Sequence, residues 1–429
     1  MRVDAVRILS GDIGATHCRF ALYHAEDTAG PEERNQALAP VLLGSRILKG
    51  ADYPAFNAAL RTLFAAGEGG PALLDPAQLP DVVVIAPAGP VEGLPGDERC
   101  RMANLPWRVE TADLRAMLGT QRVRLINDLE ALAWACLLPE AVAVRRVLPG
   151  TAKPGAPAAV TAAGTGFGQA LLLRPPAPAE AASGRCPERP GAVGGEQCSA
   201  PVFRDSCAAA GEGFGSAPVF RDSCVAAGEG FDSAPAFPER PADLLWRLAR
   251  ARVLPSEGGH VEFPFTGARE FAFAAFAAAR LGTDRLLCDH IAAGAGLAHI
   301  LAFLGGPDVG PVEAAALCPQ YPEALEWYAR FYGRACRVYV LHTMALGGVY
   351  LAGGMAARLN IPESPAFAAE FRADSHPSDL MREVPVFHAR DPHAGLFGAA
   401  VFGMLCFGRE CLPGRFDPCF NPHPGPSAG

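Results

Sequence analysis

The N-terminus of this 429-residue sequence lacks the apolar run that a signal peptide or a membrane span requires. In the opening stretch, MRVDAVRILSGD, apolar residues never continue for more than a few positions. This absence predicts a cytoplasmic protein with no membrane partner. A long basic run is also missing, and the formal net charge is −8, so we expect no nucleic-acid partner.

Paired cysteines are missing as well. The 13 cysteines form an odd count, and none stands in a C-x-x-C pair or at the spacing of a zinc ribbon. A metal finger is therefore excluded. In a reducing compartment these cysteines are most simply buried thiols or incidental surface residues.

Hydrophobic periodicity is missing from residues 175–241, where Pro, Ala, Gly and Glu dominate. This low-complexity insertion contains a 17-residue tandem repeat, SAPVFRDSCAAAGEGFG at 199–215 and SAPVFRDSCVAAGEGFD at 216–232. Two copies are too few for a solenoid, which needs about three repeats to bury its faces. The composition favours a disordered surface loop that has undergone an in-frame duplication, and a partner-docking segment is the alternative.

Outside the insertion, short apolar strands alternate with helical stretches, which is typical of an α/β fold. Half of the residues are hydrophobic, and the length suits two domains. The predicted strands are residues 6–9, 20–23, 82–85, 123–126, 158–162 and 349–352. The predicted helices are residues 55–65, 270–280 and 323–346.

Glycines and carboxylates gather where these strands end. In SGDIGATHCRF, Asp12, Gly14 and Thr16 stand between two apolar runs. In LINDLEALAWA, Asn127 and Asp128 follow a strand and precede a helix. Hairpin turn chemistry and an ordinary helix N-cap explain these two stretches without any function. The alternative for the first stretch is an anion-binding loop whose carboxylate holds a metal ion.

Three further stretches share this pattern. They are TAAGTGFGQALL with Gly164, Thr165, Gly166 and Gly168, VLPSEGGHVEF with Glu257, Gly258, Gly259 and His260, and VYLAGGMAARL with Gly353 and Gly354. Taken singly, a hairpin turn, a polar turn and close helix–strand packing explain them. No G-x-x-x-x-G-K-[ST] sequence occurs, so a P-loop is excluded.

Taken together and in this order, the five stretches resemble the bacterial glucokinase family of the actin-like, hexokinase-like ATPase superfamily. APAGPVEG, MANLPW and HAGLFGAAVFGML resemble further segments of that family. EGGH together with IND is the most specific part of the resemblance. A related family of repressors and sugar kinases follows its Glu-x-Gly-His with a cysteine-rich zinc site, whereas VEFPFTGAREF after His260 has no cysteine.

The resemblance implies a two-domain actin-like (ribonuclease H-like) α/β ATPase fold with an interdomain cleft. A small domain would span residues 1–138 and be completed by about 391–407, and a large domain would span 139–390. The insertion at 175–241 and a C-terminal tail at 408–429 fall outside the resemblance. Members of that family are often dimers, so the resemblance allows a homodimer.

For the sugar side, the resemblance implies that Asp128 is the catalytic base that takes the proton of the sugar 6-hydroxyl. Asn127, Glu257 and His260 would hold hydroxyls of glucose or a related hexose. The family's further sugar-contacting glutamate corresponds to Asp289, which is one carbon shorter.

For the nucleotide side, the resemblance implies ATP, with Mg²⁺ organised by Asp12 through water. The residues that would line the nucleotide are Gly11, Asp12, Gly14, Thr16, Gly164, Thr165, Gly166, Gly353 and Gly354. The family has a second glycine after Gly14, where this chain has Ala15. An alanine there costs roughly 1 kcal/mol if its φ is positive and little if its φ is negative.

The leading hypothesis is therefore an ATP-dependent hexose kinase, most simply a glucokinase that makes glucose 6-phosphate at the first step of glycolysis. The alternatives are a sugar-binding or sensing protein with weak or no catalysis and a kinase for another hexose. Ala15, Asp289 and the duplicated segment motivate the sensing protein, whereas Asp128, the implied base, favours a kinase.

Overall fold

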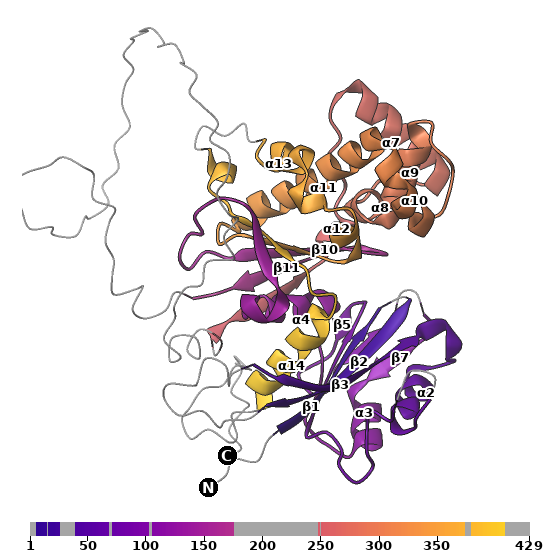
Figure 1. Ribbon diagram of the computed structural model, residues 1–429, viewed down its shortest axis with the longest axis vertical. Helices are drawn as coiled ribbons and strands as arrows, with labels where there is room; N and C mark the ends of the chain where they lie inside the picture. Colours follow the sequence, from indigo (N-terminus) through magenta and orange to yellow (C-terminus); the bar gives the residue numbers. More distant parts are fainter. Residues whose placement is uncertain are drawn as a thin grey trace, which may run out of the picture.

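The computed structural model describes residues 6–14, 16–25, 39–67, 71–102, 105–175, 248, 250–373 and 379–407. Ala15, the C-terminal tail and all of the insertion except Pro175 therefore lie outside the described residues. The described chain forms two lobes, each built on a large sheet, with two helices between them (Figure 1).

The first sheet has the strand order β3-β2-β1-β4-β8. Its strands are β1 (Val6–Ile13), β2 (His17–Ala25), β3 (Val41–Lys49), β4 (Val82–Pro87) and β8 (Val123–Leu125). β1 pairs antiparallel with β2 and parallel with β4. Every residue of β4 is buried, because Val83 and Ile85 face one hydrophobic core while Val82 and Val84 face another. A strand covered on both faces has an unbroken apolar run, as VVVIAP does.

Smaller elements cover one face of this sheet. They are α2 (Phe56–Arg61), α3 (Thr111–Leu118) and a three-stranded sheet of β5 (Val91–Glu92), β6 (Arg99–Arg101) and β7 (Arg108–Glu110). Phe56 of α2 and Leu114 of α3 share a core with Val83. α3 ends at Gly119, which takes the left-handed conformation common at helix ends.

The second sheet has the strand order β12-β11-β10-β13-β14-β9. Its strands are β9 (Val144–Leu148), β10 (Ala158–Ala163), β11 (Phe167–Leu173), β12 (Arg252–Ser256), β13 (Val349–Ala352) and β14 (Val386–Ala389). The helices of this lobe are α7 (Gly267–Leu281), α8 (Cys288–Ala292), α9 (Gly294–Phe303), α10 (Pro311–Leu317), α11 (Pro322–Thr343), α12 (Gly354–Arg358) and α13 (Pro365–Phe371). The long helix α11 contributes several aromatic side chains to the hydrophobic core of this lobe, including Trp327, Tyr328, Phe331 and Tyr332.

The two sheets repeat one topology. In each, the first strand forms an antiparallel hairpin with the second, and the third pairs antiparallel with the second. In each, two later strands continue the sheet parallel to the first strand. The strand order 3-2-1-4-5 therefore occurs twice, and β9 is an extra antiparallel strand at the edge of the second sheet.

Two helices, α4 (Asp128–Ala135) and α14 (Ala394–Phe407), lie between the lobes (Figure 1). They approach so closely that a Cβ on Gly398 would lie 1.8 Å from the carbonyl oxygen of Ala131. Both helices belong to a core that contains Ile8 of the first sheet and Val160 of the second. The two sheets are thus joined by one continuous hydrophobic core.

Two observations on the described part of the chain concern membrane helices and cysteines. Within that part, no helix is both long enough and apolar enough to cross a membrane. The described cysteines are all free thiols, and all but Cys406 are buried, as expected of cysteines that pack as small apolar residues.

The predicted strands and helices are all present, and their ends move by only a few residues. One difference concerns the site. Gly11 and Asp12 belong to β1 instead of the turn that follows it, because the ladder with β2 continues to Ile13. β1 thus ends at Ile13, and β2 begins at His17.

Candidate active site

Asp12 lies near the carboxyl end of β1, opposite Arg19 of β2. The Nη1 atom of Arg19 donates a hydrogen bond to Oδ2 of Asp12 over 3.2 Å. Burial raises the pKa of Asp12, and the charge and hydrogen bond of Arg19 offset part of that increase. Gly395, in the first turn of α14, faces this carboxylate, since a Cβ there would be 3.5 Å from Cγ of Asp12.

The turn after β1 is short and open. The amide of Gly14 donates to the carbonyl of His17 over 3.0 Å, and the carbonyl of Thr16 accepts from Gly50 over 3.2 Å. The Thr16 side chain is exposed. Gly11 is buried and packs against Ile85, so it shapes the strand and does not line the surface.

Asn127 and Asp128 form the start of α4, directly after β8. Asn127 is the N-cap, because its Oδ1 accepts from the amide of Leu129 over 2.9 Å. Its Nδ2 donates to the carbonyl of Gly89 over 3.2 Å. The capping role that an ordinary helix start requires therefore falls on Asn127. Asp128 is the first helical residue, and its Oδ1 accepts from the same Leu129 amide over 2.9 Å.

Burial raises the pKa of Asp128 to about 7, and the charge of Asp12 adds to the increase. The two carboxylates thus share one small region and disfavour each other's charge. A cation between them would relieve this repulsion. Mg²⁺ takes one or two carboxylates together with water and substrate phosphates, so this donor set fits it. Among the described residues no group of three or more acidic, His or Cys side chains could enclose a metal ion, so a closed protein cage is excluded there.

The second group of predicted residues lies around the β10–β11 hairpin. The amide of Gly164 donates to the carbonyl of Gly166 over 2.8 Å, which closes the turn, and Thr165 between them is exposed. Gly353 caps α12 with a φ of +90°, and a Cβ there would be 2.4 Å from the carbonyl oxygen of Ala163. That position requires glycine. A Cβ on Gly354 would meet no atom within 4 Å.

The EGGH turn follows β12 and lies directly on β11. A Cβ on Gly258 would be 2.1 Å from Oε1 of Gln169, and one on Gly259 would be 2.0 Å from the carbonyl oxygen of Phe167. Two glycines are therefore needed for this close approach. Flanking them, Nδ1 of His260 lies 2.7 Å from Oε2 of Glu257, and both side chains are about two-thirds exposed, at 66% and 70%. The pair is accessible to a ligand.

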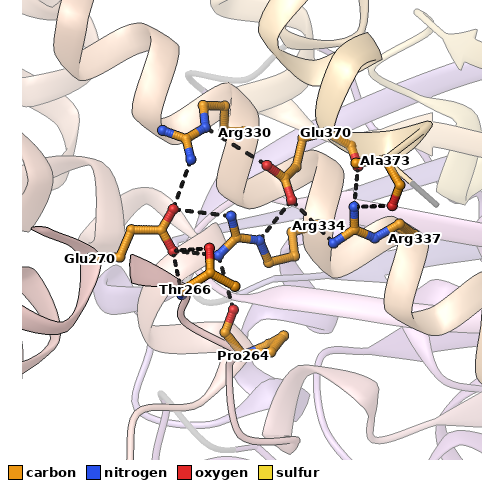
Figure 2. A network of polar contacts seen from close by, with 8 residues as sticks. All are labelled: Pro264, Thr266, Glu270, Arg330, Arg334, Arg337, Glu370 and Ala373. Atoms are coloured by element: carbon orange, nitrogen blue, oxygen red, sulfur yellow. Dashed lines mark hydrogen bonds and ion pairs between the residues drawn. The ribbon is translucent and has the colours of Figure 1, made fainter. Parts of the chain in front are cut away.

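A buried ion network supports the chain just beyond this turn (Figure 2). Arg334 of α11 is 2% exposed and pairs with Glu270 of α7 over 2.5 Å and with Glu370 of α13 over 2.8 Å. It also donates to the carbonyl of Pro264 over 3.0 Å, and Glu270 accepts from the amide of Thr266 over 2.8 Å. Burial alone would raise the pKa of Glu270, but hydrogen bonds from Arg334 and Thr266 outweigh it and lower the pKa.

Asp289, the second residue of α8, lies between the hairpin and the EGGH turn. Its Oδ1 accepts from the amide of Phe167 over 2.5 Å and is 3.0 Å from where a Cβ on Gly166 would stand. A Cβ on Gly259 would be 4.0 Å from the Cβ of Asp289. The structure therefore brings Asp289 to the predicted site, although its carboxylate already has a backbone partner.

The two groups meet where α4 begins. A Cβ on Gly168 of β11 would be 2.5 Å from the side chain of Leu129, the residue after Asp128. The predicted positions follow the carboxyl ends of the parallel strands β1, β8, β10 and β13. Ligands of open α/β sheets bind at this edge.

Two polar residues near the site escaped the sequence interpretation. Arg19 pairs with Asp12, and Gln169 lies buried under Gly258 with its Nε2 atom lacking a hydrogen-bond partner among the described residues. Each is an exception in its strand, because Arg19 is the one arginine in HCRFALYHA and Gln169 is the one polar side chain in FGQALLL. That exception is the signal that could have identified them.

The duplicated sheet topology, together with carboxylates and glycine turns where the parallel strands end, is that of the actin-like ATPase fold. Among solved structures, the chain is similar to a glucokinase from an Antarctic psychrotroph, with a TM-score of 0.60, 20% identity and coverage of 92% of this chain and 98% of that one. It is also similar to the glucokinase of Balamuthia mandrillaris in complex with glucose, with a TM-score of 0.60, 17% identity and 93% of each chain covered.

The sequence comparisons are more specific. The glucokinase of Pseudomonas paraeruginosa is 28% identical over 409 residues, which cover 92% of this chain and 91% of the relative. The glucokinase family profile matches residues 9–184 and 241–405. The chain belongs to the glucokinase family of sugar kinases. The resemblance inferred from the five stretches is thereby confirmed.

Proposed function

We propose that the protein transfers the γ-phosphoryl group of ATP to the 6-hydroxyl of glucose, giving ADP and glucose 6-phosphate. Membership of the glucokinase family supports a sugar kinase. The observation that carries the reaction is the position of Asp128, whose carboxylate begins α4 beside Asp12.

In this reaction the sugar O6 forms a bond to the γ-phosphorus, and the bond from that phosphorus to the β,γ-bridging oxygen breaks. The proton of the 6-hydroxyl passes to the carboxylate of Asp128. A general base must be ionised at the working pH and still basic enough to accept a proton. The pKa of Asp128, raised to about 7 by burial and by Asp12, meets both demands.

Asp12 is the residue that would hold Mg²⁺, through water, and the ion would neutralise charge on the phosphates. The glycine turns would bind the nucleotide through backbone amides, because a missing side chain lets phosphate approach the main chain. The proposed phosphate residues are Gly14, Thr16, Gly164, Thr165 and Gly166, with Gly353 and Gly354 near the adenosine. Gly11 acts only indirectly, through the shape of β1.

The sugar would lie against Glu257 and His260, whose exposed pair offers a carboxylate and an imidazole to its hydroxyls. Asn127 has one amide hydrogen left after its bond to Gly89. Asp289 has its Oδ2 atom left after its bond to Phe167.

A coupled assay of ADP release with a panel of hexoses tests the proposal. We expect turnover that requires Mg²⁺ and is fastest with glucose. The Asp128→Asn variant should lose turnover and keep glucose-induced thermal stabilisation, while Glu326→Gln, which changes an exposed acid on α11, should behave as the parent. A folded parent without turnover on any hexose would exclude the kinase.

The same measurements separate the alternatives. Stabilisation by sugar without turnover would indicate a sugar-binding protein, and faster turnover with another hexose would indicate a kinase for that sugar. From the sequence we further propose the domain division at residues 138 and 139, a cytoplasmic location and a homodimer.

A further inference from the structure

The α8–α9 segment is hydrogen-bonded to both halves of the proposed site. Toward the sugar side, the amide of Cys288 donates to the carbonyl of Val261 over 2.8 Å, directly after the EGGH turn. Toward the nucleotide side, the amide of Gly294 donates to the carbonyl of Gly164 over 3.1 Å. This segment is therefore a physical link between the turn proposed to hold sugar and the hairpin proposed to hold phosphate.

Asp289 supplies a side-chain contact within this link. Its Oδ1 accepts from the amide of Phe167 over 2.5 Å. The hairpin is therefore held at Phe167 by this carboxylate and at Gly164 by the amide of Gly294. A hydrogen bond to a charged acceptor is stronger than one between neutral groups. Within the described residues, no hydrogen-bond donor is found at Oδ2, which leaves that atom for a ligand.

We propose that Asp289 is a positioning residue for the phosphate-side hairpin, and that sugar and nucleotide binding are coupled through it. The inference rests on the proposed function, since it assumes that the hairpin binds nucleotide. Oδ1 holds Phe167, and with it the adjoining Gly166 and Thr165, in the conformation that the phosphates meet. A sugar hydroxyl at Oδ2 fixes the same carboxylate, so each substrate favours the arrangement that the other requires.

The test is the binding of a non-hydrolysable ATP analogue with Mg²⁺, measured by calorimetry in the absence of sugar. Asp289→Ala removes the acceptor, and we expect about tenfold weaker binding. Asp289→Asn keeps an oxygen for the Phe167 amide, so most of the affinity should return. Asp284→Ala removes an exposed acid from the loop before α8 and should bind the analogue as the parent does.

Two results would overturn the inference. If Asp289→Ala binds the analogue as tightly as the parent, the carboxylate does not position the hairpin. If both variants at 289 bind it more tightly, charge repulsion of the phosphates outweighs any anchoring. If the alanine variant fails to fold, Asp289→Ser replaces it in the same binding measurement. Serine suits the start of a helix but is too short to reach the Phe167 amide, so the same loss of affinity is expected.

Coupling is tested by repeating the titration with saturating glucose. The parent should bind the analogue more tightly with glucose than without it, and Asp289→Ala should lose that difference. Equal tightening in both proteins would contradict coupling through Asp289. A parent that binds no nucleotide would refute the proposed function and this inference together, whereas normal parental turnover with an unaffected Asp289→Ala would refute only the inference.

Discussion

Burial raises the pKa of Asp128 and the charge of Asp12 raises it further, although Asp12 lies in β1 and Asp128 follows β8, two strands that are not neighbours. β4 separates β1 from β8 in the sheet, so the two carboxylates approach each other at the carboxyl edge of the sheet, where α4 begins. A fold that places two acids together in this way loses stability when both are ionised. The loss can be measured.

Replacing Asp128 should therefore stabilise the protein in a pH-dependent manner. Because the folded pKa of about 7 lies above the ordinary value, the stability that this group contributes is present at acid pH and is lost as the pH rises through 7. In metal-free buffer at pH 8, Asp128→Asn should have a higher melting temperature than the parent, equivalent to about 1 kcal/mol or more in the free energy of unfolding. At pH 4 the two proteins should melt at the same temperature.

Thermal unfolding at the two pH values checks this expectation. Glu326→Gln serves as the control, because it changes an exposed acid on α11 and should leave the pH dependence unchanged. A parental melting temperature at pH 8 that equals or exceeds that of Asp128→Asn would contradict the raised pKa of Asp128.

The rate of catalysis should depend on pH in the opposite direction to stability, through the same residue, Asp128. The rate should fall as the pH drops through about 7, because a protonated Asp128 cannot accept the proton of the sugar hydroxyl. Asp128→Asn should lower kcat by roughly 10²- to 10⁴-fold. Steady-state kinetics from pH 5.5 to 9 test both statements, and a parental kcat/KM that is flat below pH 7 would argue against Asp128 as the base.

Gly353 and Gly354 offer a matched pair of substitutions. Gly353→Ala places a Cβ at positive φ and against the carbonyl of Ala163, so we expect a loss of about 2 kcal/mol or more in the free energy of unfolding. Gly354→Ala meets no atom and should keep the parental stability. If the adenosine lies at Gly354, Gly354→Ala should raise the KM for ATP and leave the KM for the sugar unchanged. Urea unfolding and ATP titrations give both quantities, and equal stability of the two variants would be the contrary result.

Arg334 should be the most sensitive charged residue of the second lobe. Arg334→Ala leaves Glu270 and Glu370 buried without this partner, and breaking a buried pair in this way costs about 3–5 kcal/mol. The control is Arg269→Ala, which breaks an ion pair with Glu323 whose side chains are 62% and 52% exposed and should cost less than about 1 kcal/mol. Chemical denaturation compares them, and similar losses would show that the network contributes little.

The sequence predicted the strands and helices well, because strands buried on both faces carry apolar runs that are visible without a structure. VVVIAP of β4 and VYLA of β13 are such runs. The site residues after these strands could be located for the same reason. The sequence could not show which of Asn127 and Asp128 is the N-cap of α4, because either side chain can cap a helix. Only the geometry identifies Asn127.

Contacts between segments that are distant along the chain also could not be predicted from the sequence. Asp289 and the amide of Phe167 are separated by 122 positions, and no local pattern predicts their hydrogen bond. The same holds for Arg334 and Pro264. Hydrophobic period and turn chemistry report on neighbours along the chain, whereas these pairs depend on how whole elements pack.

The packing of α14 has a consequence for synthesis. This helix, near the end of the chain, lies on the first sheet, where Gly403 approaches Val84 and Gly395 approaches Asp12. A nascent chain emerging from the ribosome can pair its early strands long before α14 exists. Until α14 has folded onto this sheet, the carboxylate of Asp12 lacks the neighbour that Gly395 provides. The surroundings of Asp12 are therefore complete only after α14, which follows β1 by most of the length of the chain, has been synthesised.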